Sequence, residues 1–327
     1  MILSKEQIKT IAKGVLYWSD GIEGGLIPHR YSCLQEEIYS SDERRLLRTR
    51  ATSGVRLECR TDASEVELAA RIFEGSGKNW YGFDLMVDGF LFGHLEGTLE
   101  ETDHTHWIQR LPEGEKNLVI HLPCLTGAEI LNVVLRGATF CYPVESAERI
   151  LFTGDSITQG YHSHFPSLTY CAQVAAFRGA EVLNQGNGGE VFNSSILVPL
   201  NWNPTLAVIA YGTNDWATKD RESFARDAAE FLDRFCQVWP DLPTAVISPI
   251  WRADSMKSRS DGFLYEEVYD VLQFAAAKHP QINVINGHGL LPQIEALMYD
   301  GQLHPNELGF TIYAKRLAAT LDQVYSK

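Results

Sequence analysis

Five short apolar segments in the second half of the chain constrain its fold more than any other feature. Each is bounded by turn residues and is apolar on both faces, which is typical of strands in a parallel sheet covered on both sides. The segments are Arg149–Thr153, Glu181–Asn184, Leu206–Tyr211, Thr244–Ser248 and Ile282–Ile285. Apolar residues at helical spacing lie between and after them. Alternating strands and helices predict a three-layer α/β domain with a parallel sheet.

The first half of the chain has a different periodicity. Apolar residues alternate there with the period of half-buried strands, in the runs Val55–Cys59, Val66–Ile72, Phe83–Val87, Leu118–Leu122 and Leu131–Leu135. Asp88-Gly89 lies next to one run and predicts a tight hairpin, because both residues tolerate positive φ. Ser4 and Gln7 have the spacing of a helix capping box. We expect an antiparallel β-sandwich in residues 1–145 and the α/β domain in residues 146–327.

Charge and cysteine usage exclude several classes of function. The 327 residues carry a formal net charge of −14, which repels phosphate backbones and anionic lipids, so we expect neither a nucleic acid nor a membrane partner. The six cysteines have no zinc-binding pattern and are interpreted as reduced thiols. No secretory signal or membrane span of about 18 apolar residues is visible, which predicts a cytoplasmic protein. The sequence does not predict an oligomeric state.

Four polar loops follow strands of the predicted parallel sheet, where ligands of such sheets gather. They contain Gly154-Asp155-Ser156, Asn184–Glu190, Gly212–Asp215 and Asp300–Asn306. A serine hydroxyl becomes an effective nucleophile when a neighbouring histidine takes its proton. Glycine-rich loops and an asparagine amide can supply the donors that an oxyanion intermediate needs. The loops together therefore indicate acyl-transfer chemistry.

These four blocks resemble those of the SGNH (GDSL-type) serine hydrolases, over roughly residues 149–327. The resemblance implies a flavodoxin-like αβα fold with five parallel strands and an esterase that needs no cofactor and no metal. It also implies the roles of individual residues. Ser156 resembles the nucleophile and His304 the general base, while Gly189 and Asn214 resemble oxyanion donors beside the Ser156 N–H. Gly186 is the alternative register for Gly189.

One position departs from the family pattern. The family's acidic residue usually stands three positions before the histidine, but position 301 is glycine here and Asp300 stands four before. Asp300 can still orient His304 if the loop absorbs the extra residue. A solvated Asp300, with a backbone carbonyl in its place, is the alternative.

The first 145 residues are similar in composition to the jelly-roll-like sandwich domain of some carbohydrate deacetylases and of an acyltransferase in this superfamily. The resemblance implies an esterase acting on small O-acyl esters, with an acylated sugar as one such substrate. Two alternatives stay open. One is an acyltransferase that uses the same residues, and the other is a carbohydrate-binding protein with a non-catalytic α/β domain.

Five further residues are candidates for substrate binding because they adjoin the four loops or the end of the fourth strand: Asp155, Tyr161, His162, Trp216 and Trp251. Solvated loops or core packing are the alternatives for these side chains. Arg252 could contact an acidic substrate group, although the sequence favours a surface arginine.

Three other motifs have weaker functional interpretations. His104-Thr105-His106 and His162-Ser163-His164 each offer a histidine pair without an obvious third metal ligand, so solvated loops are favoured. Gly75-Ser76-Gly77-Lys78 resembles part of a phosphate-binding loop. Position 72, however, is isoleucine and no Ser or Thr follows the lysine, which favours a β-turn.

Overall fold

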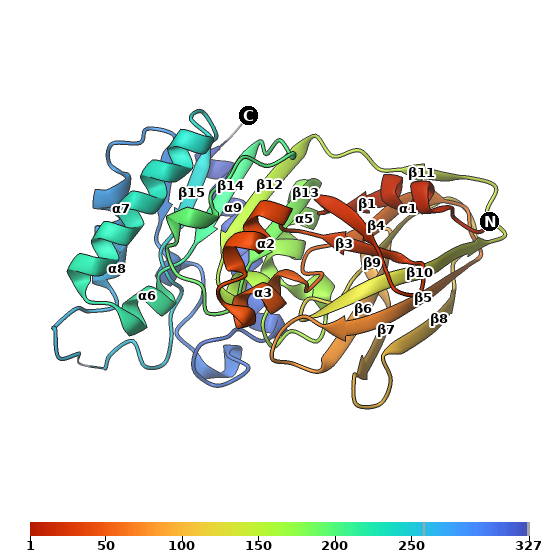
Figure 1. Ribbon diagram of the computed structural model, residues 1–327, viewed down its shortest axis with the longest axis horizontal. Coiled ribbons are helices and arrows are strands. Elements are labelled where there is room, and N and C mark those ends of the chain that lie inside the picture. The colour runs from red at the N-terminus through yellow and green to blue at the C-terminus, as the bar shows by residue number, and fades with distance from the viewer. Residues whose placement is uncertain (258, 326–327) are drawn as a thin grey trace.

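Two β-rich units lie side by side in the structure, a computed structural model that describes residues 1–257 and 259–325 (Figure 1). The unit on the right of Figure 1 contains antiparallel strands from the first half of the chain. The unit on the left contains a parallel sheet with helices on both sides. Both predicted architectures are confirmed.

The antiparallel strands form two facing sheets. In the described residues the outer sheet has the order β2-β3-β10-β5-β8 and the inner sheet the order β1-β4-β9-β6-β7, with β11 paired to β4. The outer strands are β2 (Tyr17–Asp20), β3 (Leu26–His29), β5 (Glu65–Glu74), β8 (His104–Arg110) and β10 (Thr126–Arg136). The inner strands are β1 (Ala12–Lys13), β4 (Arg56–Thr61), β6 (Trp80–Val87), β7 (Phe90–Thr98), β9 (Lys116–His121) and β11 (Cys141–Pro143).

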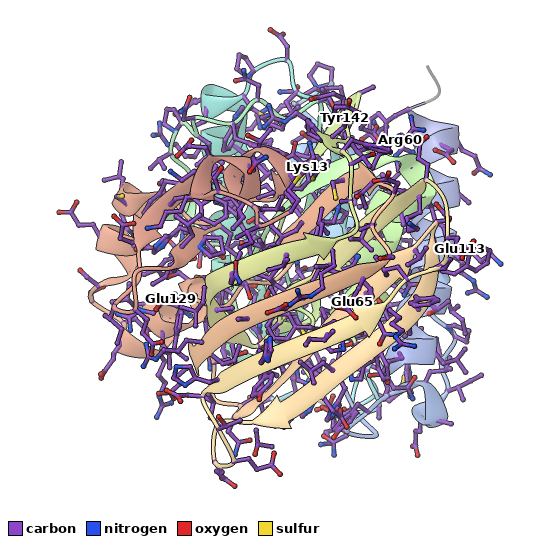
Figure 2. The ribbon with its side chains drawn as sticks, turned by 90° about the vertical axis from the view of Figure 1, so that its right-hand side faces the viewer. Lys13, Arg60, Glu65, Glu113, Glu129 and Tyr142 are labelled. Atoms are coloured by element: carbon purple, nitrogen blue, oxygen red, sulfur yellow. The ribbon has the colours of Figure 1, made fainter. Side chains whose placement is uncertain are left out.

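One hydrophobic core fills the space between these sheets. Alternate residues of the facing strands point into it, among them Leu68, Phe83, Leu85 and Ile120. Figure 2 looks onto the outer sheet, on which Glu65 of β5 and Glu129 of β10 are labelled. Antiparallel sheets commonly bury one face and leave the other to solvent, which explains the alternating pattern in the sequence.

Local signals in the first half gave a mixture of correct and incorrect predictions. Asp88 and Gly89 have φ values of 50° and 83° and join β6 to β7 as a tight hairpin, as predicted. Ser4 and Gln7 form the predicted capping box of α1 (Lys5–Ile11). The alternation over Leu131–Leu135 is interrupted, because a bulge between Ile130 and Asn132 shifts the register of β10. Leu131 is therefore not a core residue.

Several elements of the first half were not predicted. They are the short strands β1, β2, β3 and β11, the helices α2 (Cys33–Tyr39) and α3 (Glu43–Thr49), and the strand β8. β7 and β8 are largely exposed and lack a continuous apolar face. The interpretation of His104 and His106 as residues of a solvated loop is wrong, because both lie in β8.

The parallel sheet has the strand order β13-β12-β14-β15-β16 within the described residues. Its strands are β12 (Glu148–Gly154), β13 (Ala180–Gly186), β14 (Leu206–Ala210), β15 (Thr244–Ile247) and β16 (Ile282–Ile285). In chain order this is 2-1-3-4-5, the flavodoxin-like arrangement, with a topological switch point beside the first strand. The loops after β12, β13 and β14 therefore meet at one edge.

Helices cover both faces of the parallel sheet. One layer contains α5 (Tyr170–Arg178) and α9 (Glu307–Val324), and the other contains α7 (Arg221–Val238) and α8 (Glu267–Ala276). Two short helices, α4 (Ser156–Gln159) and α6 (Thr213–Thr218), follow β12 and β14. None of the helices in residues 1–257 and 259–325 combines the length and the apolar character that crossing a membrane requires.

Buried polar contacts connect the two units. Arg30 is fully buried, and its guanidinium donates hydrogen bonds of 2.6–2.8 Å to the carbonyl oxygens of Ala51, Asn184, Gly186 and Arg48. Arg30 thus joins the end of β13 to the segment around α3, which lies against the parallel sheet in Figure 1. Buried carbonyls without a donor are costly, so this guanidinium stabilises the contact between the units.

We predict that Arg30→Met destabilises the protein, since several buried carbonyls lose their donor. At about 1–3 kcal/mol per unsatisfied group, the melting temperature should fall by about 5 °C or more. Arg44→Met changes an exposed residue of α3 and should lower it by less than about 2 °C. Scanning calorimetry of both variants measures the difference. Equal melting temperatures would show that Arg30 does not stabilise the fold.

Candidate active site

Ser156 lies at a sharp strand-to-helix turn. It is the first residue of α4, directly after β12, and is 7% exposed. Asp155 caps this helix by accepting the Ile157 N–H at 2.9 Å. A Cβ at Gly154 would lie 2.8 Å from the Ala210 carbonyl oxygen and would also clash with Thr158, so only glycine fits there. The turn places the serine hydroxyl at the switch point of the sheet.

A continuous hydrogen-bond chain runs from Ser156 through His304 to Asp300. Ser156 Oγ lies 2.9 Å from His304 Nε2, and His304 Nδ1 lies 2.7 Å from Asp300 Oδ2. The side chain of His304 is 13% exposed and that of Asp300 is 29% exposed. Ser156 and His304, which are 148 residues apart in the chain, are thus brought together at one edge of the sheet.

The loop that carries Asp300 absorbs the extra residue before the histidine. Gly301 has a φ of 70°, a left-handed conformation that glycine adopts without strain. Asp300 Oδ1 accepts N–H groups of Gln302, Leu303 and His304 at 2.8–3.2 Å. Partial burial alone would raise the pKa of Asp300, but these N–H donors and His304 outweigh it and hold the pKa well below its usual range. Asp300 is therefore ionised beside the imidazole.

Opposing effects act on the pKa of His304. Burial lowers it, because the charged imidazolium loses water, whereas the contact with Asp300 raises it. The positive charges of Lys78 and Arg252 lower it further, and the net shift is downward. A neutral imidazole at neutral pH can accept a proton from Ser156.

Two potential oxyanion donors lie in the loops after β13 and β14. Gly189 has a φ of 76°, and its N–H has no hydrogen-bond partner among the described residues. Asn214 donates one amide hydrogen to the Glu190 carbonyl oxygen at 2.9 Å, which fixes its orientation and leaves the second hydrogen for another acceptor. The Gly186 N–H instead donates to Asn184 Oδ1 at 2.8 Å. This geometry favours Gly189 over Gly186.

The N-terminal half of the chain supports the glycine loop. Arg48 of α3 donates to the Gly188 carbonyl oxygen, and Arg45 donates to that of Gly189 at 3.3 Å. Arg45 Nη1 also lies 3.6 Å from the fully buried carboxylate of Glu190. Carbonyls held in this way keep the neighbouring N–H groups in a fixed orientation.

An aromatic wall flanks His304. Tyr161 and His162 each have a ring centroid 5.1 Å from that of His304. The ring of His162 stacks on Tyr299 at 4.5 Å, and Trp80 of β6 stacks on His164 at 4.9 Å. Burial, together with His304 and Lys78 nearby, lowers the pKa of His162 to about 4. Both halves of the chain therefore contribute side chains to this wall.

Three of the residues predicted to bind substrate have capping or packing contacts in the structure. Asp155 is 3% exposed and caps α4, and burial raises its pKa to about 7. Trp216 is 4% exposed and packs in the core, where its indole N–H donates to the Phe263 carbonyl oxygen at 3.1 Å. Trp251 is half-buried against the core under α9. Large aromatic side chains are used more often for packing than for ligand binding.

Arg252 also differs from its predicted position. Its guanidinium is 11% exposed, lies 2.5 Å from Asp254 and donates to Thr213 at 3.0 Å. It is therefore neither a surface arginine nor free to bind a substrate anion.

His162, Asp300 and His304 offer ligand atoms within 4.8 Å of one another, a spacing that could hold a metal ion. Sequence spacing did not reveal this group, because Asp300 and His304 are distant from His162 in the chain. His304 is already hydrogen-bonded to Ser156 through Nε2 and to Asp300 through Nδ1. A metal bound there would break the serine–histidine contact.

Sequence reasoning missed several residues near the site: Arg45, Arg48, Lys78, Trp80 and Tyr299. Lys78 belongs to a motif that was noted and interpreted as a β-turn. Tyr299 directly precedes Asp300, which was a usable signal. Arg45 and Arg48 gave no signal, because nothing in the sequence connects α3 to the glycine loop.

Comparisons with known proteins agree with this geometry. Residues 152–312 match the model of the GDSL-like lipase/acylhydrolase family. A search of curated proteins found no match. The chain shares its fold with the salicylyl acyltransferase SsfX3 from a tetracycline biosynthetic pathway, at 21% identity and a TM-score of 0.79, covering 96% of this chain and 95% of that one.

Two carbohydrate esterases have the same fold. A family two carbohydrate esterase from Clostridium thermocellum, solved with cellohexaose, is 16% identical, with a TM-score of 0.69 and coverage of 95% of this chain and 98% of that one. An acetyl xylan esterase from the rumen bacterium Butyrivibrio proteoclasticus is 12% identical, with a TM-score of 0.67 and coverage of 99% and 98%. The resemblance seen in the sequence is confirmed, because residues 152–312 match the GDSL-like lipase/acylhydrolase family.

Proposed function

We propose that this protein is a serine esterase that hydrolyses small, short-chain O-acyl esters through an acyl-enzyme on Ser156. One observation carries the proposal: Ser156 Oγ lies 2.9 Å from His304 Nε2, and Asp300 lies 2.7 Å from the other ring nitrogen. Such a chain allows a base to take the serine proton while the carboxylate holds the imidazole tautomer. The GDSL-like family match supports the same class of reaction.

In the first half-reaction, Ser156 Oγ attacks the ester carbonyl carbon and its proton passes to His304 Nε2. The resulting tetrahedral intermediate collapses, the bond to the alcohol oxygen breaks, and His304 returns the proton to that oxygen. In the second half-reaction, water attacks the acyl group on Ser156 and gives a proton to His304. The bond between the acyl carbon and Ser156 Oγ then breaks, and His304 returns the proton to Oγ, which releases the carboxylic acid and regenerates the serine.

Negative charge on the carbonyl oxygen is stabilised by N–H donors in this proposal. The Ser156 N–H, the Gly189 N–H and the free amide hydrogen of Asn214 are the donors. Their positions are set before substrate binds, by α4 capping, by Arg45 and Arg48, and by the Asn214–Glu190 contact. Preorganised donors stabilise a developing oxyanion without reorganisation during the reaction.

Acyl transfer to an alcohol or amine other than water is the second candidate function. The solved structures of similar fold include a salicylyl acyltransferase as well as carbohydrate esterases, and the same residues would serve both reactions. Product analysis after incubation with candidate acceptors, among them sugars, distinguishes transfer from hydrolysis. An acylated acceptor would identify a transferase.

We predict that Ser156→Ala lowers kcat for a chromogenic acetate ester by at least about 10³-fold, since the nucleophile is lost. Initial rates at 400 nm measure the effect. The matched control is Ser195→Ala, which changes an exposed loop serine and should keep kcat within about twofold. Ser156→Ala activity within tenfold of the unmodified protein would refute the serine mechanism.

We predict that Asp300→Asn lowers kcat by roughly 10⁴, because an amide cannot hold the imidazole in the productive tautomer. Asp261→Asn alters an aspartate that pairs with Arg259 away from the site and should leave kcat nearly unchanged. Circular dichroism checks that both variants fold. A decrease of less than tenfold for Asp300→Asn would mean that another group orients His304.

A further inference from the structure

The loop between β5 and β6 extends from the sandwich to the proposed active site. Ser76 in this loop is fully buried, and its hydroxyl accepts the Lys78 N–H at 3.2 Å. Lys78 Nζ lies 4.8 Å from the ring centroid of Trp80 and 5.3 Å from that of Tyr161. Because the Tyr161 ring is itself 5.1 Å from the ring of His304, a single side chain separates the ammonium group from the proposed base.

Lys78 has no carboxylate partner among the described residues, because no carboxylate oxygen there lies within 4.0 Å of its Nζ. Two neighbouring carboxylates have other partners: Glu96 lies 3.5 Å from His164, and Glu100 accepts a hydrogen bond from Asn79 at 2.7 Å. Glu74 lines the same surface pocket as Lys78 but does not approach its ammonium group within 4.0 Å. Arg252, in contrast, is paired with Asp254. The ammonium group is therefore held by aromatic rings alone, which leaves its hydrogens available to an anion.

A free cation at this position has an effect on the proposed base. The chain as a whole carries a formal charge of −14, yet Lys78 lowers the pKa of both His304 and His162. During the reaction His304 becomes positively charged, so an uncompensated ammonium nearby opposes the step. An anionic group on the substrate would neutralise Lys78 and remove this opposition.

Two polar atoms of the same aromatic wall also lack partners. Trp80 Nε1 and His162 Nδ1 are buried without a hydrogen bond, and His162 has a φ of 70°, which is rare for a residue with a side chain. Lys78 and Trp80 line an open surface pocket with Glu74, Gly77, Asn79 and Leu99. Buried polar groups are nearly always paired, so this wall has features of a binding site rather than of a core.

The position of Lys78 determines which part of a substrate it can reach. His304 returns its proton to the oxygen of the departing alcohol, so the alcohol must extend from Ser156 past His304. The Tyr161 ring lies 5.1 Å from the His304 ring, and Lys78 Nζ lies 5.3 Å from the Tyr161 ring, so a ring-sized alcohol that extends past His304 along Tyr161 would reach the ammonium group.

We propose that Lys78 binds an anionic group, a carboxylate or a phosphate, on the alcohol part of the ester, while Trp80 and Tyr161 hold the ammonium in place. The inference rests on the proposed esterase function of Ser156. It identifies the substrate class as short-chain esters of anionic, ring-sized alcohols. A lysine ammonium is a compact point charge that binds either anion. The structure therefore indicates a negative charge on the alcohol but does not distinguish a carboxylate from a phosphate.

The test compares esters that share an acetyl group and differ in the charge of the alcohol. The anionic probes are 3-acetoxybenzoate and 3-acetoxyphenyl phosphate, and the neutral probe is 3-acetoxybenzamide. We expect kcat/KM to be about 10–100-fold higher for at least one anionic ester, mainly through a lower KM, as is usual for a hydrogen bond to a charged group. Raising the ionic strength should reduce this preference.

Variants of Lys78 connect the preference to the residue. Lys78→Gln should reduce the ratio of kcat/KM between anionic and neutral esters by about tenfold or more, Lys78→Arg should largely preserve it, and Lys78→Glu should reverse it. Lys315→Gln, on the exposed side of α9, is the matched control and should leave the ratio unchanged. If Lys78→Gln does not fold, Lys78→Arg and Lys78→Glu still test whether the preference depends on the charge at position 78.

The outcomes separate this inference from the proposed function. If Ser156→Ala loses the hydrolysis of 3-acetoxybenzamide and the preference for anionic esters depends on Lys78, both the inference and the proposed function are supported. Ser156-dependent hydrolysis with no anionic preference, or with a preference that survives Lys78→Gln, overturns the inference alone. A preference for 4-nitrophenyl succinate over 4-nitrophenyl butyrate, without one in the alcohol series, would place the charge in the acyl group and also overturn it. No hydrolysis of any ester overturns the proposed function.

Discussion

The buried guanidinium of Arg30 connects the two halves of this protein at the loop on which the candidate site depends. Its hydrogen bonds reach the carbonyls of Asn184 and Gly186 at the end of β13 and that of Arg48 on α3. The glycine loop begins where β13 ends, so the same contacts set the position of Gly189. A buried charge is costly unless its donors are satisfied, and here backbone carbonyls satisfy them. The sandwich and the α/β unit therefore form one site rather than two independent ones.

This arrangement explains why the candidate site is built from both halves. Ser156, Asn214 and His304 come from the carboxyl-terminal edge of the parallel sheet, as expected for this class of fold. The N-terminal half adds Arg45 and Arg48 behind the glycine loop, and Lys78 and Trp80 in the aromatic wall that contains Tyr161 and His164. We infer that the α/β unit supplies the reaction and that the sandwich supplies part of the substrate preference. The division between residues 1–145 and 146–327 stays a prediction, as does a cytoplasmic location.

The sequence predicted the parts of the molecule that depend on short-range patterns. The five apolar segments identified the parallel strands, because both faces of each strand are buried, and Ser156 was found because it directly follows the first of them. Asp300 was uncertain, since a one-residue shift could only be judged once the left-handed conformation of Gly301 was known. Trp216 was misplaced because proximity to Asn214 in the chain says nothing about which way a helical side chain points. Lys78 and Arg48 could not be predicted, because their roles depend on contacts between distant segments. The prediction that Leu131 is a core residue failed within a single strand, because a bulge interrupts the alternation of apolar residues in β10.

Covalent labelling of the nucleophile tests the central claim most directly. A fluorophosphonate reacts with a serine only when a base activates it and donors stabilise the resulting oxyanion-like adduct, so it reports on the assembled site. Intact mass spectrometry and peptide mapping after incubation should show one adduct, on the peptide that contains Ser156. The adduct should be absent in His304→Ala. An unlabelled protein, or an adduct on a different serine, would contradict the account.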